Sequence, residues 1–173
     1  TVLTFVVPIL TMRLFAEERK TGTEQLLLTS PRGITAIVIG KFLAAAGVIL
    51  VAELLTLGYL AILFYFATPS VLIAITTLLG FFLLSLAYIS FGMFASSLTE
   101  NQIIAYILSI VVFLVMWFLA GLTDFTKIFA LIDLYSYFPA GLISISSIIT
   151  FISFSVLFIV LTIIMLQRRK SIK

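Results

Sequence analysis

Cysteine and histidine do not occur in this chain of 173 residues, and only 10% of its residues are charged. Without cysteine there are no disulfides and no thiol chemistry, and without both residues nearly all zinc and haem ligation is excluded. The chain also carries far fewer charges than the ~25% of residues that are charged in a soluble domain. Hydrophobic residues make up 63% of the sequence. The solvent around most of this chain must therefore be lipid.

The apolar residues form long continuous runs, which predict an all-α, polytopic membrane helix bundle. Four runs are close to the ~20 residues that a spanning helix needs, and we place them at residues 42–66, 71–95, 103–121 and 144–166. They lack the alternation of a barrel strand, so helices are predicted. A fifth run, residues 1–12, would reach only about 18 Å as a helix, against a hydrocarbon layer of about 30 Å. We interpret it as the cytoplasmic end of a truncated segment in a chain that lacks its beginning.

Basic residues lie almost entirely on one side of this predicted bundle. Nine of them fall between the first two segments or after the last one, and only Lys127 falls on the other side. The nine are Arg13, Arg19, Lys20, Arg32, Lys41, Arg168, Arg169, Lys170 and Lys173. This bias places them, and the C-terminus, in the cytoplasm.

The cytoplasmic stretch 16–40 contains Thr21-Gly22-Thr23-Glu24, which has the pattern of a capping box. In that arrangement the Thr21 hydroxyl caps the Glu24 amide, and the Glu24 carboxylate returns to the Thr21 amide. A short helix through residues 25–28 would follow and end before Gly33. Two interpretations fit equally well: a helix resting at the membrane interface, or a helix offered to a cytoplasmic partner.

On the opposite side, residues 122–143 are too apolar for a solvated loop, and Pro139 and Gly141 interrupt them. We expect one or two short helices that re-enter the bilayer or lie on its outer leaflet. An interfacial aromatic belt is the alternative interpretation.

No motif of catalysis or nucleotide binding is present. The nearest approach to a phosphate-binding loop, from Gly33 to Lys41, has six intervening residues instead of four and lacks the hydroxyl after the lysine. Histidine and cysteine are absent, and no pair of carboxylates is placed for acid–base work. The chain is therefore not expected to be an enzyme by itself.

Glu53 lies near the middle of the 42–66 segment, where a charge costs about 2.5–3.5 kcal/mol. Helical spacing puts Thr56 and Leu60 on the same face. One interpretation is a polar contact in a translocation path, or a proton-linked site. The other is a protonated carboxyl bonded to a neighbouring helix, or a position beside a water-filled vestibule.

Small residues that let helices pack closely cluster in the second and third segments. We expect them to serve packing within the bundle, with a dimer seam as the alternative. They are Gly40, Ala44, Ala45, Ala46, Gly47, Ser85, Ser90, Gly92 and Ser96.

The run FAEERKTGTEQLLLTSP at residues 15–31, followed by Gly40-Lys41-Phe42, resembles the signature of type-2 ABC exporter permeases. The run FASSLTENQI at residues 94–103 is similar to the gliding-motility-associated branch of that family. The resemblance covers nearly the whole chain and weakens after Gly121. It implies six spans, of which five segments are seen here, in a single transmembrane permease domain over residues 1–173 with external re-entrant helices before the last span.

The resemblance also implies partners and a mechanism. Such permeases pair in the bacterial inner membrane, and each binds a separate ATPase subunit that holds the ATP and magnesium. Residues 16–33 would form the cytoplasmic coupling-helix elbow that docks on the ATPase, and the substrate would be exported by alternating access. The residues implied in coupling are Glu17, Glu18, Thr21, Glu24, Leu26, Leu27, Leu28, Glu100 and Asn101. Glu53 has no counterpart in the family pattern, so the resemblance does not support a role for it. Glu53 and Thr56 remain candidates for a translocation path from their position alone.

Two other functions stay open at this point. The chain would be a membrane anchor or structural subunit of a motility or signalling machine if it had the same partner but no cargo. It would be a proton-coupled secondary transporter if Glu53 carried the proton, although the inverted repeat typical of many such transporters is not found. No nucleic-acid partner is expected, and lipid surrounds the chain in every case.

Overall fold

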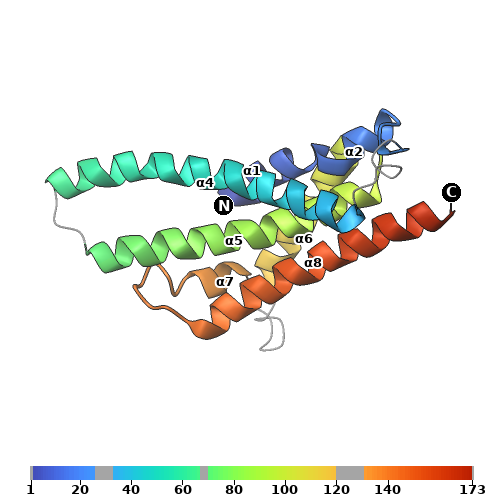
Figure 1. Ribbon diagram of the computed structural model, residues 1–173. Coiled ribbons are helices and arrows are strands. Elements are labelled where there is room, and N and C mark those ends of the chain that lie inside the picture. Colours follow the sequence, from blue (N-terminus) through green and yellow to red (C-terminus); the bar gives the residue numbers. More distant parts are fainter. Residues whose placement is uncertain (1, 26–32, 67–69, 120–130, 173) are drawn as a thin grey trace.

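The computed structural model describes residues 2–25, 33–66, 70–119 and 131–172 (Figure 1). Within these ranges every regular element is an α-helix and there is no strand, which confirms the predicted helical class. The helices are α1 (Val2–Thr11), α2 (Arg13–Lys20), α4 (Ile34–Phe66), α5 (Val71–Leu98), α6 (Gln102–Leu119), α7 (Leu131–Tyr135) and α8 (Ile145–Ile172).

Three helices in the described part of the chain, α4, α5 and α8, are long and apolar enough to cross a membrane. The helix α6 is apolar but shorter. The helix α4 begins eight residues before the predicted span at 42, and its 33 residues reach about 50 Å. It is therefore longer than the hydrocarbon layer and carries the chain from the membrane into the basic region around Lys41.

The helix α5 is the centre of the bundle, because it contacts each of the other six described helices. Its small residues make this possible: Ser85, Ser90 and Ser96 are fully buried. At Gly92, an added Cβ would lie 2.2 Å from the Thr11 hydroxyl oxygen of α1. The small residues of α5 thus pack within the bundle, as predicted. In α4 only Ala45 and Ala46 of the predicted set are buried, while Gly40, Ala44 and Gly47 are exposed.

The helical backbone of α1 continues almost without a break into α2, which begins with the first charged residue, Arg13. Only Met12 separates α1 from α2, and its backbone is itself right-handed helical. The Met12 amide donates to the carbonyl of Pro8 at 2.9 Å. The chain is therefore nearly continuous helix from residue 2 to residue 20, and it carries its direction from the apolar core into the basic region.

The segment around α7 folds back onto the bundle, between α5 and α8 in Figure 1. Phe138 is fully buried, and its side chain lies so close to Gly80 that an added Cβ would be 2.4 Å from its ring. The Thr76 hydroxyl lies 2.9 Å from the Phe138 carbonyl oxygen, to which it can donate. This satisfies backbone that leaves the helix at depth, as irregular backbone in a membrane requires. The packing favours the fold-back interpretation over a belt; residues 122–130 lie outside the described ranges.

Candidate functional site

Most of the charged residues described by the structure belong to segments that lie together at one end of the bundle (Figure 1), which we call the charged end. It consists of residues 13–25, the start of α4 at 33–41, the α5–α6 turn at 98–102 and the end of α8 at 167–170. Three ion pairs connect these pieces: Arg19–Glu100 at 2.8 Å, Lys41–Glu18 at 2.5 Å and Arg169–Glu24 at 3.4 Å. The predicted gathering of the two basic regions on one side is thus present in the structure.

An apolar cluster lies under the charged end and supports it. Its buried members come from α2, α4, α5 and α8: Phe15, Ile34, Val38, Met93 and Leu166. Because residues of four helices pack together in this cluster, the segments of the charged end rest on one shared hydrophobic core.

The predicted capping box is wrong. Thr21 ends α2 instead of starting the next helix: its amide donates to the Glu17 carbonyl at 2.9 Å, and its hydroxyl lies 2.9 Å from the same oxygen. Gly22 follows with φ +76°, the left-handed conformation that commonly terminates helices. The Glu24 carboxylate pairs with Arg169 and does not return to Thr21. The last carbonyl groups of α2 have no partner within the helix, and they accept the hydrogen bonds of the Thr21 amide and hydroxyl. The left-handed conformation of Gly22 then ends the helix.

Ser96, which lies on the central helix α5, forms hydrogen bonds with the beginning of α2. Its oxygen accepts hydrogen bonds from the Phe15 amide at 3.1 Å and the Ala16 amide at 3.0 Å, and its hydroxyl donates to the Met12 carbonyl at 2.8 Å. The first amides of a helix have no acceptor within the helix, and Met12 supplies no side-chain cap. Ser96 therefore caps α2 from a position about 80 residues away in the chain. In the sequence, Ser96 was predicted as a small packing residue and as part of the 94–103 run that resembles the family, but no local pattern links it to Phe15.

Lys41 attaches the start of α4 to α2. Its ammonium group pairs with the Glu18 carboxylate, bonds the Leu14 carbonyl oxygen and lies 4.4 Å from the centre of the Phe15 ring. A carboxylate, a carbonyl and an aromatic face all stabilise a cation. Lys41 thus does more than mark the entry of α4 into the membrane.

Arg19 attaches the end of α2 to the α5–α6 turn. It pairs with Glu100, and it also donates to the Leu98 carbonyl at 3.2 Å, one of the carbonyls left free at the end of α5. Asn101 then caps α6, since its side-chain oxygen accepts from the Ile103 amide at 2.9 Å. The turn that carries Glu100 and Asn101, two of the residues implied in coupling, is thus bonded directly to α2.

The residues predicted to take part in coupling fall into three groups. Glu17, Thr21, Glu100 and Asn101 are exposed on the outside of the charged end. Glu18 and Glu24 are more enclosed, with side chains 28% and 14% exposed, and both hold basic residues of other helices. The third group, residues 26–28, lies outside the described ranges.

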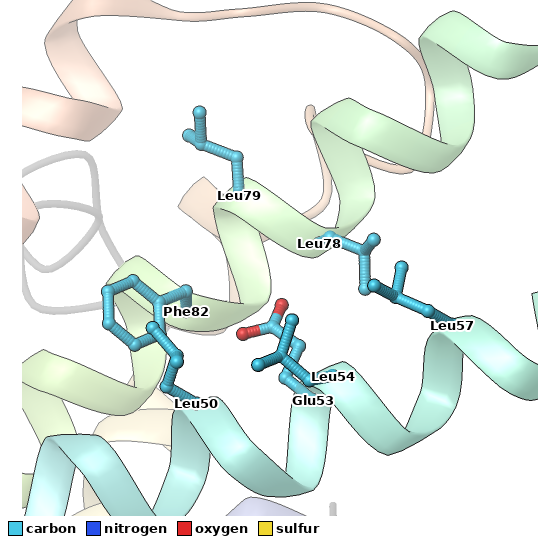
Figure 2. A pocket seen from close by; sticks show the side chains of 7 residues that line it. All are labelled: Leu50, Glu53, Leu54, Leu57, Leu78, Leu79 and Phe82. Atoms are coloured by element: carbon cyan, nitrogen blue, oxygen red, sulfur yellow. The ribbon is translucent and has the colours of Figure 1, made fainter.

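Glu53 lies on the side of α4 that faces α5, far from the charged end (Figure 2). Its carboxyl borders a cavity of about 230 Å³ whose other lining side chains are leucines and one phenylalanine. The Oε1 atom is buried and has no hydrogen-bond partner in the described part of the chain. Thr56 is exposed, and its hydroxyl donates to the Glu53 carbonyl at 2.6 Å instead of reaching the carboxyl. The structure thus leaves Oε1 of this carboxyl unpaired within the bundle.

Comparison with known proteins identifies the family of the chain. No curated protein and no solved structure matches the chain. The ABC-2 family transporter proteins match it over residues 1–167, from α1 to all but the end of α8. This match fits the long apolar helices and the charged end, and the membrane subunits of that family are normally not catalytic themselves. The chain therefore belongs to the ABC-2 family of transporter proteins, as a multi-pass membrane subunit of an ABC transporter.

Proposed function

We propose that the chain is the permease subunit of an ATP-driven export complex, and that its charged end docks a separate ATPase subunit. Membership of the ABC-2 family supports an ATPase partner, because permeases of this family typically pair with one. The nine basic residues on one side support a cytoplasmic charged end and C-terminus in a bacterial inner membrane. The similarity of residues 94–103 to gliding-motility-associated permeases supports the same assignment.

One observation carries the docking proposal: the exposed face of the charged end is formed by two elements, which are bonded to each other and attached to the central helix. Glu17 on α2 and Glu100 with Asn101 on the α5–α6 turn are exposed, and the Arg19–Glu100 pair joins the two elements. A partner that binds this face contacts two elements attached to the central helix. Residues 16–33 act as the coupling elbow within one permease domain, residues 1–173.

The mechanism we propose is alternating access in a dimer of permease subunits. The partner ATPase holds the ATP and magnesium, and its closure moves α2. Ser96 and Arg19 transmit this movement to α5, which touches every other described helix. A displacement at the charged end therefore reaches the membrane part of the bundle through direct contacts.

The docking proposal predicts that Glu17→Arg reduces the ATPase recovered with the permease by at least tenfold, because reversing a charge at an interface costs several kcal/mol and about 1.4 kcal/mol already corresponds to tenfold. The permease would be co-expressed with the ATPase encoded beside it, and both would be quantified after purification in detergent. Glu24→Arg is the weaker choice, because it would also break the pair with Arg169. Asp133→Arg is the matched control, an exposed carboxylate on α7, away from the charged end.

The control variant should retain the ATPase at the wild-type level. Equal recovery with Glu17→Arg and wild type would move the dock away from α2. Failure of the wild-type chain to retain any ATPase would refute the proposed function as a whole.

A further inference from the structure

The cavity beside Glu53 has the composition of a small-molecule site. Its wall on α4 is a single helical stripe, with Leu50, Leu54 and Leu57 spaced around Glu53, and Leu78 and Phe82 of α5 face it (Figure 2). Ligand sites are mostly apolar, with a few polar groups that fix the orientation of the ligand. In this cavity the carboxyl is the one ionisable group in the lining.

The Glu53 carboxyl differs from three other glutamates of the chain, which each form an ion pair. Glu18, Glu24 and Glu100 each meet a lysine or an arginine at the charged end. Glu53 Oε1 is buried and has no such partner in the described part of the chain. A buried acceptor without a donor is unfavourable, because it has lost its hydrogen bonds to water without replacement. A donor that enters the cavity from outside the chain would remove this cost.

The position of the cavity determines where such a donor comes from. Glu53 follows Lys41 by twelve residues, which is about 18 Å along a helix and so lies within the hydrocarbon layer. The side chains that flank it on α4 are open to the surroundings, with Leu54 at 54% and Leu55 at 76% exposed. The surroundings at this depth are lipid tails, so the ligand must be soluble in the membrane.

We propose that this cavity binds a lipophilic amine, whose apolar body packs against the leucines of α4 and α5 and whose nitrogen pairs with the Glu53 carboxyl. The inference rests on the proposed export function and names the class of its cargo. An amine suits the site because a cationic donor both satisfies the buried oxygen and neutralises the charge at this depth. An uncharged amphiphile of the same shape, such as an alcohol, could donate a hydrogen bond but would leave the charge of the carboxyl uncompensated.

The test measures binding to the purified chain in phosphatidylcholine nanodiscs, without ATPase. The probes are a fluorescent dodecylamine and a dodecanol that carries the same fluorophore. We expect the wild-type chain to bind the amine at least tenfold more tightly than the alcohol. Glu53→Gln should weaken amine binding about tenfold and leave alcohol binding unchanged. Asp133→Asn, which removes an exposed carboxylate on α7, should change neither.

Two further arms sharpen the result. Leu78→Trp should fill the cavity and weaken both probes, which ties the binding to this place. Replacing part of the lipid with phosphatidylethanolamine distinguishes two sources of the amine: competition with the probe points to a lipid headgroup, and its absence points to a free amine.

Equal affinity for amine and alcohol, or amine binding that survives Glu53→Gln, would overturn the proposal. So would a loss of self-association in Glu53→Gln, because a second copy of the chain would then supply the donor. Since binding needs no ATPase and docking needs no amine, failure of this inference and failure of the export proposal give different results.

Discussion

Replacing Ser96 with alanine is expected to destabilise the protein by about 2–6 kcal/mol, because two buried amides would lose their acceptor at about 1–3 kcal/mol each. The amides are those of Phe15 and Ala16, which lie 3.1 and 3.0 Å from the Ser96 oxygen. Ser96 is fully buried, so water cannot replace the hydroxyl without entering the core. Unfolding in detergent and amide hydrogen exchange at the two positions measure the effect.

Ser97 provides the matched control, since it is 1% exposed and lies next to Ser96 in the same helix. Its hydroxyl donates to the Phe94 carbonyl at 2.7 Å, within α5 itself. Ser97→Ala should therefore change the free energy of unfolding by about 1 kcal/mol or less. Faster exchange at Phe15 and Ala16 should appear only in Ser96→Ala. Similar stability and exchange in the two variants would show that the link between α2 and α5 contributes little.

The expected cost matters for function because, in the described part of the chain, the hydrogen bonds from α2 to the central helix lie at its two ends. Arg19 holds its end to the Leu98 carbonyl, and Ser96 holds its beginning. A helix fixed to its neighbour at both ends transmits a displacement, whereas a helix fixed at one end can pivot. The proposed transmission from ATPase to membrane therefore depends on a hydroxyl that lies inside the bundle.

The sequence predicted the features that depend on local composition. Long apolar runs require helices in lipid wherever they fold, and α4, α5 and α8 lie where these runs are. The basic residues also gather as predicted, because charge sidedness is a property of the loops and tails. The start of α4 at Ile34 was missed, because Lys41 interrupts the apolar sequence and separates residues 34–40 from the predicted span that begins at 42.

The features missed by the sequence depend on contacts between distant residues. Ser96 caps a helix about 80 positions away, and Glu24 pairs with Arg169, 145 positions away. The sequence pattern at Thr21 predicted a capping box, but Thr21 instead bonds the carbonyl groups at the end of the preceding helix, α2. For Glu53 the sequence predicted a carboxyl at mid-span, while the cavity depends on how α4 and α5 align with each other.

The close approach of α1 to α5 at Gly92 gives the second large effect. An alanine Cβ there would lie 2.2 Å from the Thr11 hydroxyl oxygen and 2.9 Å from its Cβ. Thr11 is fully buried and its side chain is too short to move aside, so α1 must shift away from α5. We expect Gly92→Ala to destabilise the protein by about 1–3 kcal/mol, the usual cost of overpacking a core. This exceeds the gain of about 1 kcal/mol that alanine brings to a helix interior.

A glycine-to-alanine substitution on α4 should instead increase the stability of the protein. At Gly47 nothing lies within 4 Å of the added Cβ, so Gly47→Ala should stabilise the helix by about 0.5–1 kcal/mol. Adding Thr11→Ala to Gly92→Ala removes the hydroxyl at 2.2 Å and should restore part of the lost stability in a double-mutant cycle. Unfolding of the four variants in one detergent measures all these terms. If Gly92→Ala and Gly47→Ala shift stability in the same direction, helix propensity outweighs the crossing, and α1 is not held against α5 as closely as these distances require.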